Sequence, residues 1–275
     1  SLTGTKAPDK PADPLIVHPD IRRMLLTQRA YVEGCRALAA WVGHEIDCEE
    51  DHKDPLERQK AADFVALMTP VVKALLTDLS SEVCNIGMQV YGGHGYIREW
   101  GMEQYVRDAR ITQIYEGANG VQAMDLVGRK LAQNGGRALQ AFFKIIGEEV
   151  AAAKGNPRTA SFAEALEKAN GQLQAATMWL MQNGMTNPNN AGAGSHHYMH
   201  IMGIVAVGLM WLRMAKAAAE RLDAGAEDAA WLEAKLTTAR FYAERIMPDA
   251  GSLRRKMEGG AESLMALPPE MFADR

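Results

Sequence analysis

The sequence contains little cysteine and no excess of positive charge. Its three cysteines, Cys35, Cys48 and Cys84, lie far apart and form no CxxC pair. They therefore predict neither a disulfide framework nor a cysteine zinc site, and they fit a reducing cytoplasm. The formal net charge is -4 and the pI is near 6.0. A nucleic-acid-binding protein normally shows a basic stripe, so we expect no nucleic-acid partner.

Long apolar runs are also missing. Residues 1–14 are polar and rich in proline, which is unlike a signal peptide, and we interpret residues 1–18 as a linker at the edge of the chain. The longest uncharged apolar run, IMGIVAVGLMWL at 201–212, is well short of the roughly 20 residues that a membrane-spanning helix needs. We interpret this run as a buried core helix and expect no membrane span.

The sequence also lacks the period-two alternation of half-buried strands. Apolar residues instead recur at three- and four-residue spacing, which is typical of the buried face of a helix. With 47% apolar and 23% charged residues, the chain can bury a sizeable core. We predict an all-α fold with helical bundles at 19–155 and 156–275, joined at KGNPRT. Helices are predicted over about 20–43, 60–90, 99–111, 121–133, 137–154, 161–183, 196–222 and 227–247.

Charged and proline-containing stretches predict where these helices end. CEEDHKDPLERQ at 48–59 should end the first helix. Pro70 should kink the second helix or divide it in two, because proline removes a backbone donor and clashes with the preceding turn. MTNPNNAGAG at 185–194 should separate two of the later helices.

Three glycines in YGGHGY, Gly92, Gly93 and Gly95, interrupt the helical pattern at 91–96. Glycines allow a ligand to approach the backbone closely, and exposed amides beside a helix end can bind phosphate. The stretch follows a helix instead of a strand and lacks the third spaced glycine of a dinucleotide-binding fingerprint. Spacing alone leaves two interpretations open, a phosphate contact and a plain helix-to-helix turn.

Histidines cluster in SHHYMH, which contains His196, His197 and His200. The four-residue step from His196 to His200 could place two imidazoles on one helical face, as in helical metal sites. We expect no acidic or cysteine partner nearby, so a third ligand would have to come from elsewhere. The stretch therefore predicts a histidine cluster at a helix start without a metal.

The stretch ITQIYEGANG at 111–120 sets one acid, Glu116, between a tyrosine and small residues. Such a carboxylate could lie in water, cap the next helix, or act as a general base. The last role requires a partly desolvated pocket that tunes the acid toward the working pH. It also requires small neighbours that admit a substrate, and Gly117 and Ala118 meet that need. These residues alone leave the three interpretations open.

The stretch QVYGGHGYIREWGMEQYVRDARITQIYEGANGVQAMDL at 89–126 resembles the C-terminal signature of flavin-dependent acyl-CoA dehydrogenases. The resemblance lies in GGxGY, in RDARITQIYEG and in the 27-residue step from Gln89 to Glu116. Residues after 155 are similar to the extra helical C-terminal domain of the longer family members. Among these, the chain looks most like the 3-(methylthio)propanoyl-CoA dehydrogenase group.

The resemblance implies that Glu116 is the catalytic base, which takes the α-proton of an acyl-CoA thioester while FAD accepts the β-hydride to leave a trans-2-enoyl-CoA. It also implies that the backbone amide of Glu116 hydrogen-bonds the thioester carbonyl, an oxyanion-hole use of an amide. Residues implied to contact FAD are Gln89, Gly92, Gly93, Gly117, Ala118 and Gly120, the first three serving the FAD of a neighbouring subunit. Residues implied to lie beside the substrate are Arg23, Tyr115, Glu116 and Gly117.

The resemblance further implies an electron-transfer flavoprotein as electron acceptor, a homodimer or homotetramer, and a cytoplasmic role in fatty acid metabolism. Ala118 stands where many members have threonine, and Gly120 where many have glutamine. CEEDHKDPLERQ occupies the place of the family's Arg-x-x-Phe-Gly flavin contact. Full members begin with helical and β-barrel domains, so we expect this chain alone to be inactive. The alternative is a non-catalytic helical module that supplies oligomer contacts and part of the FAD site.

Overall fold

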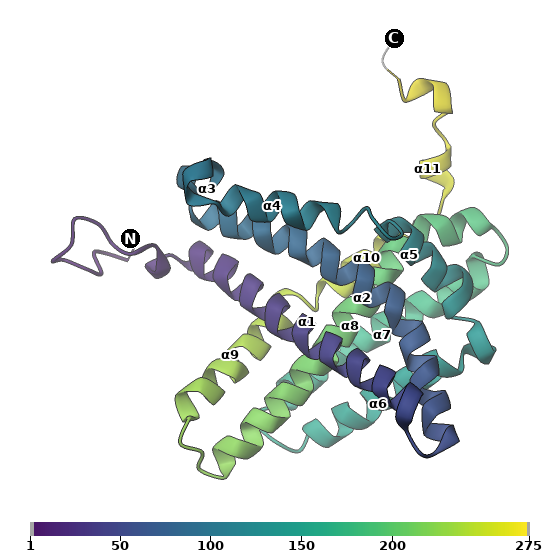
Figure 1. The fold of residues 1–275 in the computed structure, drawn as a ribbon, viewed down its shortest axis with the longest axis horizontal. Coiled ribbons are helices and arrows are strands. Elements are labelled where there is room, and N and C mark those ends of the chain that lie inside the picture. The colour runs from purple at the N-terminus through teal and green to yellow at the C-terminus, as the bar shows by residue number, and fades with distance from the viewer. Residues whose placement is uncertain (1–2, 274–275) are drawn as a thin grey trace.

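The computed structural model describes residues 3–273, and in that range all regular structure is helical, which confirms the all-α prediction (Figure 1). The α-helices are α1 Pro19–Asp51, α2 Pro55–Val90, α3 Gly93–Tyr96, α4 Met102–Ile111, α5 Asn119–Asp125, α6 Arg137–Ala153, α7 Ala160–Asn183, α8 Pro188–Asp223, α9 Ala229–Arg245, α10 Asp249–Glu258 and α11 Glu262–Met265. The described part of the predicted linker contains one helical turn, Leu15–Val17. Residues 1 and 2 of that linker lie outside the described range.

The break between α1 and α2 is much narrower than predicted. α1 continues to Asp51 and α2 begins at Pro55, so only residues 52–54 of the charged stretch are non-helical. Asp54 starts α2, because its carboxylate accepts a hydrogen bond from Leu56 N (2.9 Å) and proline occupies the first helical position. The charged residues before this point lie on α1 and face solvent without ending it.

Pro70 does not divide α2, so that part of the prediction is wrong. The helix continues without interruption from Pro55 to Val90. Pro70 leaves the carbonyl of Ala66 without its usual helical donor. The proline itself is buried among the apolar residues of α2. Because its neighbours Met68 and Val71 are fully buried as well, packing of this helical face outweighs the lost hydrogen bond.

α8 begins at Pro188, eight residues before the predicted start at 196. Asn187 caps the helix, because its side chain accepts from Asn189 N (3.0 Å), and Pro188 follows at the first helical position. The stretch predicted as a separator therefore contains a helix start. The glycines inside it are helical, and Gly194 is buried in contact range of Met257. Close packing of α8 against α10 uses a position without a side chain.

α8 is the central helix of the fold and contacts α1, α2, α5, α6, α7, α9 and α10. Every residue from 205 to 212 is buried, which confirms the predicted core helix. By length and composition alone, α2 and α8 could each cross a membrane, and 78% of the most apolar part of α8 is buried inside the fold against 44% for α2. The apolar character of α8 thus matches its place in the protein interior.

Residues from both predicted bundles share one hydrophobic core. The indole Nε1 of Trp211 in α8 donates to the carbonyl of Ala30 in α1 (3.0 Å). At the same crossing, a Cβ at Gly34 would lie 2.6 Å from Val207 Cγ1, so α1 can approach α8 this closely only because Gly34 has no side chain. The boundary near residue 155 stays a prediction, since the buried side chains on its two sides pack together.

Candidate functional site

The loop that contains Glu116 joins α4 to α5. Two consecutive residues take left-handed backbone angles, Glu116 with φ +50° and Gly117 with φ +87°. Glycine adopts such angles freely, whereas other residues take them at a cost of about 1–3 kcal/mol. A Cβ at Gly117 would also lie 2.7 Å from Gln122 Nε2. The loop is therefore a strained conformation that neighbouring groups have to hold, and it requires glycine at position 117.

The Glu116 side chain is exposed. Within residues 3–273, its carboxylate has no hydrogen-bond or ion-pair partner, and its backbone N–H donates to no acceptor. The N-cap of α5 is Ala118, so the interpretation of Glu116 as a helix cap is wrong. The described residues of this chain also form no desolvated pocket around the carboxylate. Glu116 thus presents a free carboxylate and a free amide at the surface.

Lys73 of α2 forms hydrogen bonds that keep the Glu116 loop in place. Its Nζ donates to the carbonyl oxygen of Gly117 (2.7 Å) and to Asn119 Oδ1 (2.8 Å). The second contact is partly buried, because Asn119 itself is only 7% exposed. Both contacts lie within three residues of Glu116, so Lys73 stabilises the left-handed turn without touching the carboxylate.

Asp78 extends this network from α2 into the loop and into α8. Its Oδ1 accepts from Asn119 Nδ2 (2.6 Å) and Gln113 Nε2 (2.7 Å), while its Oδ2 accepts from His200 Nε2 (2.9 Å). Burial alone would raise the pKa of Asp78, but the hydrogen bonds from His200, Gln113 and Asn119 outweigh burial and hold that pKa below its usual range. The carboxylate is therefore ionised and ties three elements together.

The expectation that no acidic partner lies near the histidines is wrong. Asp78 and His200 are 122 residues apart in the sequence, and the packing of α2 against α8 brings them together. The sequence did contain a signal for this contact. Lys73, Thr77 and Asp78 are polar residues within the otherwise apolar stretch VVKALLTDL. Three polar residues within six positions of a buried helix predict a shared polar site on one of its faces.

The other predicted FAD contacts, Gln89, Gly92 and Gly93, lie at the far end of α4, where α2 passes into α3 (Figure 1). α4 has ten residues and therefore separates them from the Glu116 loop by about 15 Å. All three are exposed, and a Cβ at either glycine would meet no heavy atom within 4 Å. Gly92 has φ +61°, which favours glycine. This open backbone fits the approach of an external group such as part of FAD.

Arg23 lies near the start of α1, at the same end of the molecule as α3 (Figure 1). The turn before α1 contributes Leu15 to an open, mainly apolar groove of about 510 Å³ that Val90, Tyr91, His94 and Trp100 also line. Arg23 itself pairs with Asp20 (2.8 Å) and is exposed. The structure therefore brings the predicted residues Tyr115 to Ala118 together in one loop and places Gly120 in the first turn of α5, whereas Arg23 lies at the end of the molecule that contains Gly92 and Gly93. At positions 118 and 120, no polar side-chain atom is available to a flavin, so a polar contact there would use the backbone.

Two family models match the chain over nearly its whole length. One is described as "Acyl-CoA dehydrogenase, C-terminal domain" and matches residues 6–131. The other is described as "Acetyl-CoA dehydrogenase C-terminal like" and matches residues 142–268. The helical fold and the signature around Glu116 agree with both matches. The chain belongs to the acyl-CoA dehydrogenase family.

The 3-methylmercaptopropionyl-CoA dehydrogenase of Ruegeria pomeroyi is 36% identical over 92% of this chain and 43% of its own length. Among solved structures, Caenorhabditis elegans ACDH-11 in complex with C11-CoA has a TM-score of 0.72 at 18% identity, covering 93% of this chain and 41% of that chain. A Bacillus anthracis acyl-CoA dehydrogenase complexed with FAD has a TM-score of 0.68 at 17% identity, covering 90% and 43%. The two structures support the fold. The chain spans less than half the length of the curated relatives it matches.

Proposed function

We propose that the chain carries the general base and part of the cofactor site of an acyl-CoA dehydrogenase, which converts an acyl-CoA thioester into a trans-2-enoyl-CoA. The observation that carries this proposal is the geometry of Glu116. Its carboxylate has no partner within residues 3–273, although its backbone is held in a left-handed turn that Lys73 fixes through Gly117. Strain at a functional residue persists where the surroundings hold it in place. A reactive acid needs this combination of fixed backbone and free carboxylate.

In this proposal, the Glu116 carboxylate removes the proton from the α-carbon of the thioester. The backbone N–H of Glu116, which has no acceptor among the described residues, donates to the thioester carbonyl oxygen and stabilises the negative charge that develops there. When bound beside this loop, FAD would supply the acceptor for the hydride of the β-carbon. Gly117 and Ala118 have little or no side chain, so a thioester can reach the amide and the carboxylate together.

Gln89, Gly92 and Gly93 are proposed to contact the FAD of a neighbouring subunit, because α4 separates them from the Glu116 loop. Such sharing requires a homodimer or a homotetramer. Arg23 is proposed to lie on the CoA side of the site, and Tyr115 beside the acyl group. We further propose that the enzyme acts in the cytoplasm and passes electrons to an electron-transfer flavoprotein, as the family resemblance implies.

The test is Glu116→Gln in the full-length enzyme that contains this chain. Removal of a general base lowers turnover by about 10²–10⁴-fold, and the flavin should stay bound because Glu116 is not needed to hold the fold. Turnover is measured as acyl-CoA-dependent reduction of an electron acceptor, and bound flavin by its visible absorbance. Glu227→Gln, at an exposed acid between α8 and α9, is the matched control and should keep full activity. Normal turnover in Glu116→Gln would refute the assigned base.

A second candidate is a helical module that supplies oligomer contacts and part of the FAD site without catalysis of its own. The exposure of Glu116 favours this role for the chain in isolation, because a base needs a partly desolvated pocket. The purified chain is then expected to leave acyl-CoA unchanged when FAD is added. Acyl-CoA-dependent bleaching of flavin by the purified chain would overturn the second candidate and leave the first one intact.

A further inference from the structure

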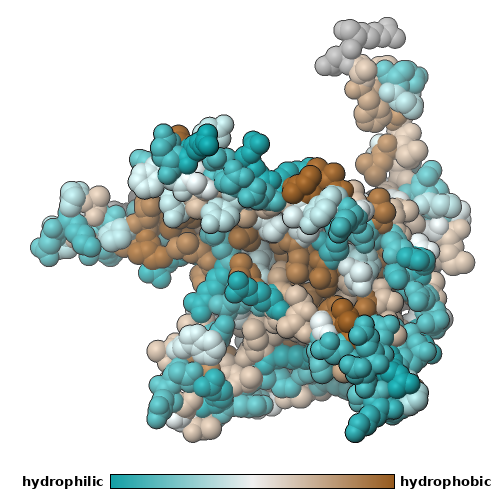
Figure 2. All heavy atoms as spheres, viewed as in Figure 1, coloured by the Kyte–Doolittle hydropathy of each residue, from teal (hydrophilic) through white to brown (hydrophobic). Residues whose placement is uncertain are grey.

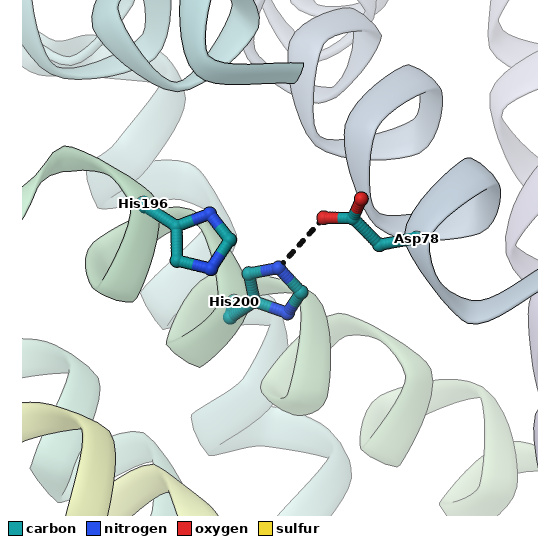
Figure 3. Close-up of side chains that lie close together, drawn as sticks. All are labelled: Asp78, His196 and His200. Atoms are coloured by element: carbon teal, nitrogen blue, oxygen red, sulfur yellow. Dashed lines mark hydrogen bonds and ion pairs between the residues drawn. The ribbon is translucent and has the colours of Figure 1, made fainter. Parts of the chain in front are cut away.

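Three side chains of metal-ligating types from two helices lie together: Asp78 of α2 and His196 and His200 of α8 (Figure 3). Each offers one ligand atom, and these atoms all lie within 4.8 Å of one another. The imidazoles come from positions i and i+4 of one helix, which places them on the same face, with ring centroids 4.5 Å apart. The carboxylate reaches them from the neighbouring helix.

The carboxylate is already oriented by groups outside the cluster. Gln113 and Asn119 both donate to Asp78 Oδ1, so Oδ2 is left to face His200 at 2.9 Å. In metal centres, outer hydrogen bonds of this kind hold a ligating carboxylate in place, and their loss weakens metal binding. The side chains of Asp78 and His200 are each 18% exposed. The cluster is thus half-buried. Gln113 and Asn119 hold its carboxylate, and His196 is exposed to solvent.

The donor types of the cluster also suit a cation. Imidazole and carboxylate are both common ligands of divalent transition metals. Two imidazole nitrogens and one carboxylate oxygen form a donor set that is typical of zinc sites that keep one position for water.

We propose that Asp78, His196 and His200 form a site for a divalent transition metal, with Zn²⁺ as the best-suited ion and water as the remaining ligand. Ligand atoms around tetrahedral zinc lie about 3.3 Å apart, given metal–ligand distances of about 2.0–2.1 Å. Asp78 Oδ2 and His200 Nε2 lie within a few tenths of an ångström of this separation, and the metal would displace the proton that they now share in a hydrogen bond. Rotation of the exposed His196 side chain closes the remaining gap. The site does not depend on the dehydrogenase chemistry proposed above.

A bound metal would also affect the Glu116 loop, through the hydrogen bonds of Asp78. Asp78 would contact the metal through one oxygen and Gln113 and Asn119 through the other, so an occupied site would fix the network that supports Gly117. A metal that binds the folded chain and not the unfolded chain raises the free energy of unfolding. The size of the rise depends on the metal concentration and on the affinity. The proposal therefore has a readout in stability that is independent of turnover.

Two other features could bind a metal and have to be separated from this site. On α1, Cys48 Sγ lies 3.6 Å from His44 Nε2, one helical turn away. On α8, His197 is adjacent to the cluster, and its ring centroid lies 5.6 Å from that of His196. We therefore choose Cys48→Ser as the background for all measurements, and His197→Asn as the matched control beside His196→Asn.

The experiment is titration of the metal-free 275-residue chain with Zn²⁺ by calorimetry and with Co²⁺ by its visible absorption, which reports geometry and nitrogen ligation. One Zn²⁺ should bind, and Zn²⁺ should raise the thermal midpoint. Asp78→Asn, His196→Asn and His200→Asn should each weaken binding about 100-fold or more, whereas His197→Asn should change it less than threefold. Gln113→Ala, which removes an outer hydrogen bond, should weaken binding by about tenfold.

The proposal is overturned if no metal binds below about 100 µM, or if the three ligand variants bind within threefold of the background chain. A response of His197→Asn equal to that of His196→Asn would overturn it as well, because it would indicate adventitious binding by surface histidines. If His200→Asn or Asp78→Asn fails to fold, His196→Asn carries the same test, since this residue is exposed. Circular dichroism of each variant establishes that it is folded.

Discussion

α8 and the segment from α4 to the Glu116 loop are built in opposite ways. In α8 every residue from 205 to 212 is buried, whereas α4 buries none of its residues. The second region is nevertheless rich in apolar side chains, and Tyr105, Ile111 and Ile114 are 61%, 55% and 53% exposed. Figure 2 shows apolar surface on this side of the molecule, near the end of α4 that leads to α5. Exposed apolar patches of this kind mark sites of interaction.

The two regions therefore have different roles: α8 stabilises the chain, and the Glu116 loop presents the candidate base. Burial of α8 against seven other helices provides the apolar contacts that stabilise the chain. The Glu116 loop adds little buried apolar surface, and it is held by polar contacts from Lys73, Asn119 and Asp78. Damage to α8 should therefore unfold the whole chain. Damage to the polar network should loosen the loop first and leave the core helix intact.

The largest expected effect follows from Trp211→Ala. Trp211 is fully buried in α8 and donates to the carbonyl of Ala30. Loss of a buried aromatic side chain costs about 3–5 kcal/mol, a large part of the stability of a typical domain. Trp100→Ala, which removes a 57% exposed indole before α4, should cost less than about 1 kcal/mol. Urea unfolding followed by far-ultraviolet circular dichroism measures both, and equal losses would contradict the comparison.

The next largest effect follows from Asn119→Ala. The Asn119 side chain is buried, donates to the carbonyl of Ala74 and to Asp78, and accepts from Lys73. Its removal leaves these partners unsatisfied and should cost about 2–3 kcal/mol. Asn85→Ala, which removes one exposed hydrogen bond on α2, should cost about 0.5 kcal/mol.

Hydrogen exchange locates the damage in Asn119→Ala. Exchange should accelerate at the amides of 116–118, and the amides in the middle of α8 should exchange as in the unaltered chain after correction for global stability. Acceleration spread evenly over α8 and the loop would show that the two regions are not separate, contrary to the comparison.

Most of the helical architecture could be predicted from the sequence, because apolar spacing is a local property. α4, α6, α7 and α9 lie within a few residues of their predicted ranges. The errors occur where tertiary packing decides. Pro70 lies inside α2 with its side chain buried, and Gly194 lies inside α8 where an added Cβ would be 2.7 Å from Met257 Cγ. The residues that pack against Pro70 and Gly194 cannot be recognised from the neighbours of these two residues in the sequence.

The candidate site divides in the same way. Glu116 is singled out by its sequence neighbours and by the family resemblance, and its role stays a prediction. The network that holds its loop was not predicted, because Lys73, Asn119 and His200 come from three distant segments. Long-range contacts of this kind depend on how α2 crosses α8. In the sequence, these contacts are indicated by the isolated polar residues of VVKALLTDL.

A smaller effect is expected from the pH dependence of Asp78. Its pKa is lower in the folded chain than the ordinary value of 3.8, so its contribution is fully present above the ordinary value and is lost as pH falls through the folded value. Hydrogen bonds to charged groups contribute about 1.5–3 kcal/mol, so Asp78→Asn should lose about 2 kcal/mol at about pH 6. The difference between the two proteins should shrink at about pH 3.

Chemical unfolding at a series of pH values measures this difference. Asp63 and Glu149, whose pKa values are also lowered, are present in both proteins, so their contributions cancel. In both residues burial alone would raise the pKa, and hydrogen bonds from basic partners outweigh it. A difference that stays constant from pH 6 to about pH 3 would show that the ionised Asp78 carboxylate does not stabilise the network.

The smallest effect, and the finest test of the loop, comes from Gly120→Gln. Gly120 lies in the first turn of α5, is exposed, and would place a Cβ in open space. Glutamine is a better helix former than glycine, so unfolding free energy should rise by about 0.5 kcal/mol. Gly117→Ala is the contrasting variant and should lose more than about 1 kcal/mol, because φ at position 117 is +87°. If Gly120→Gln destabilises as much as Gly117→Ala, the strain is not confined to the two left-handed residues, and the rigid turn assigned to Glu116 extends into α5.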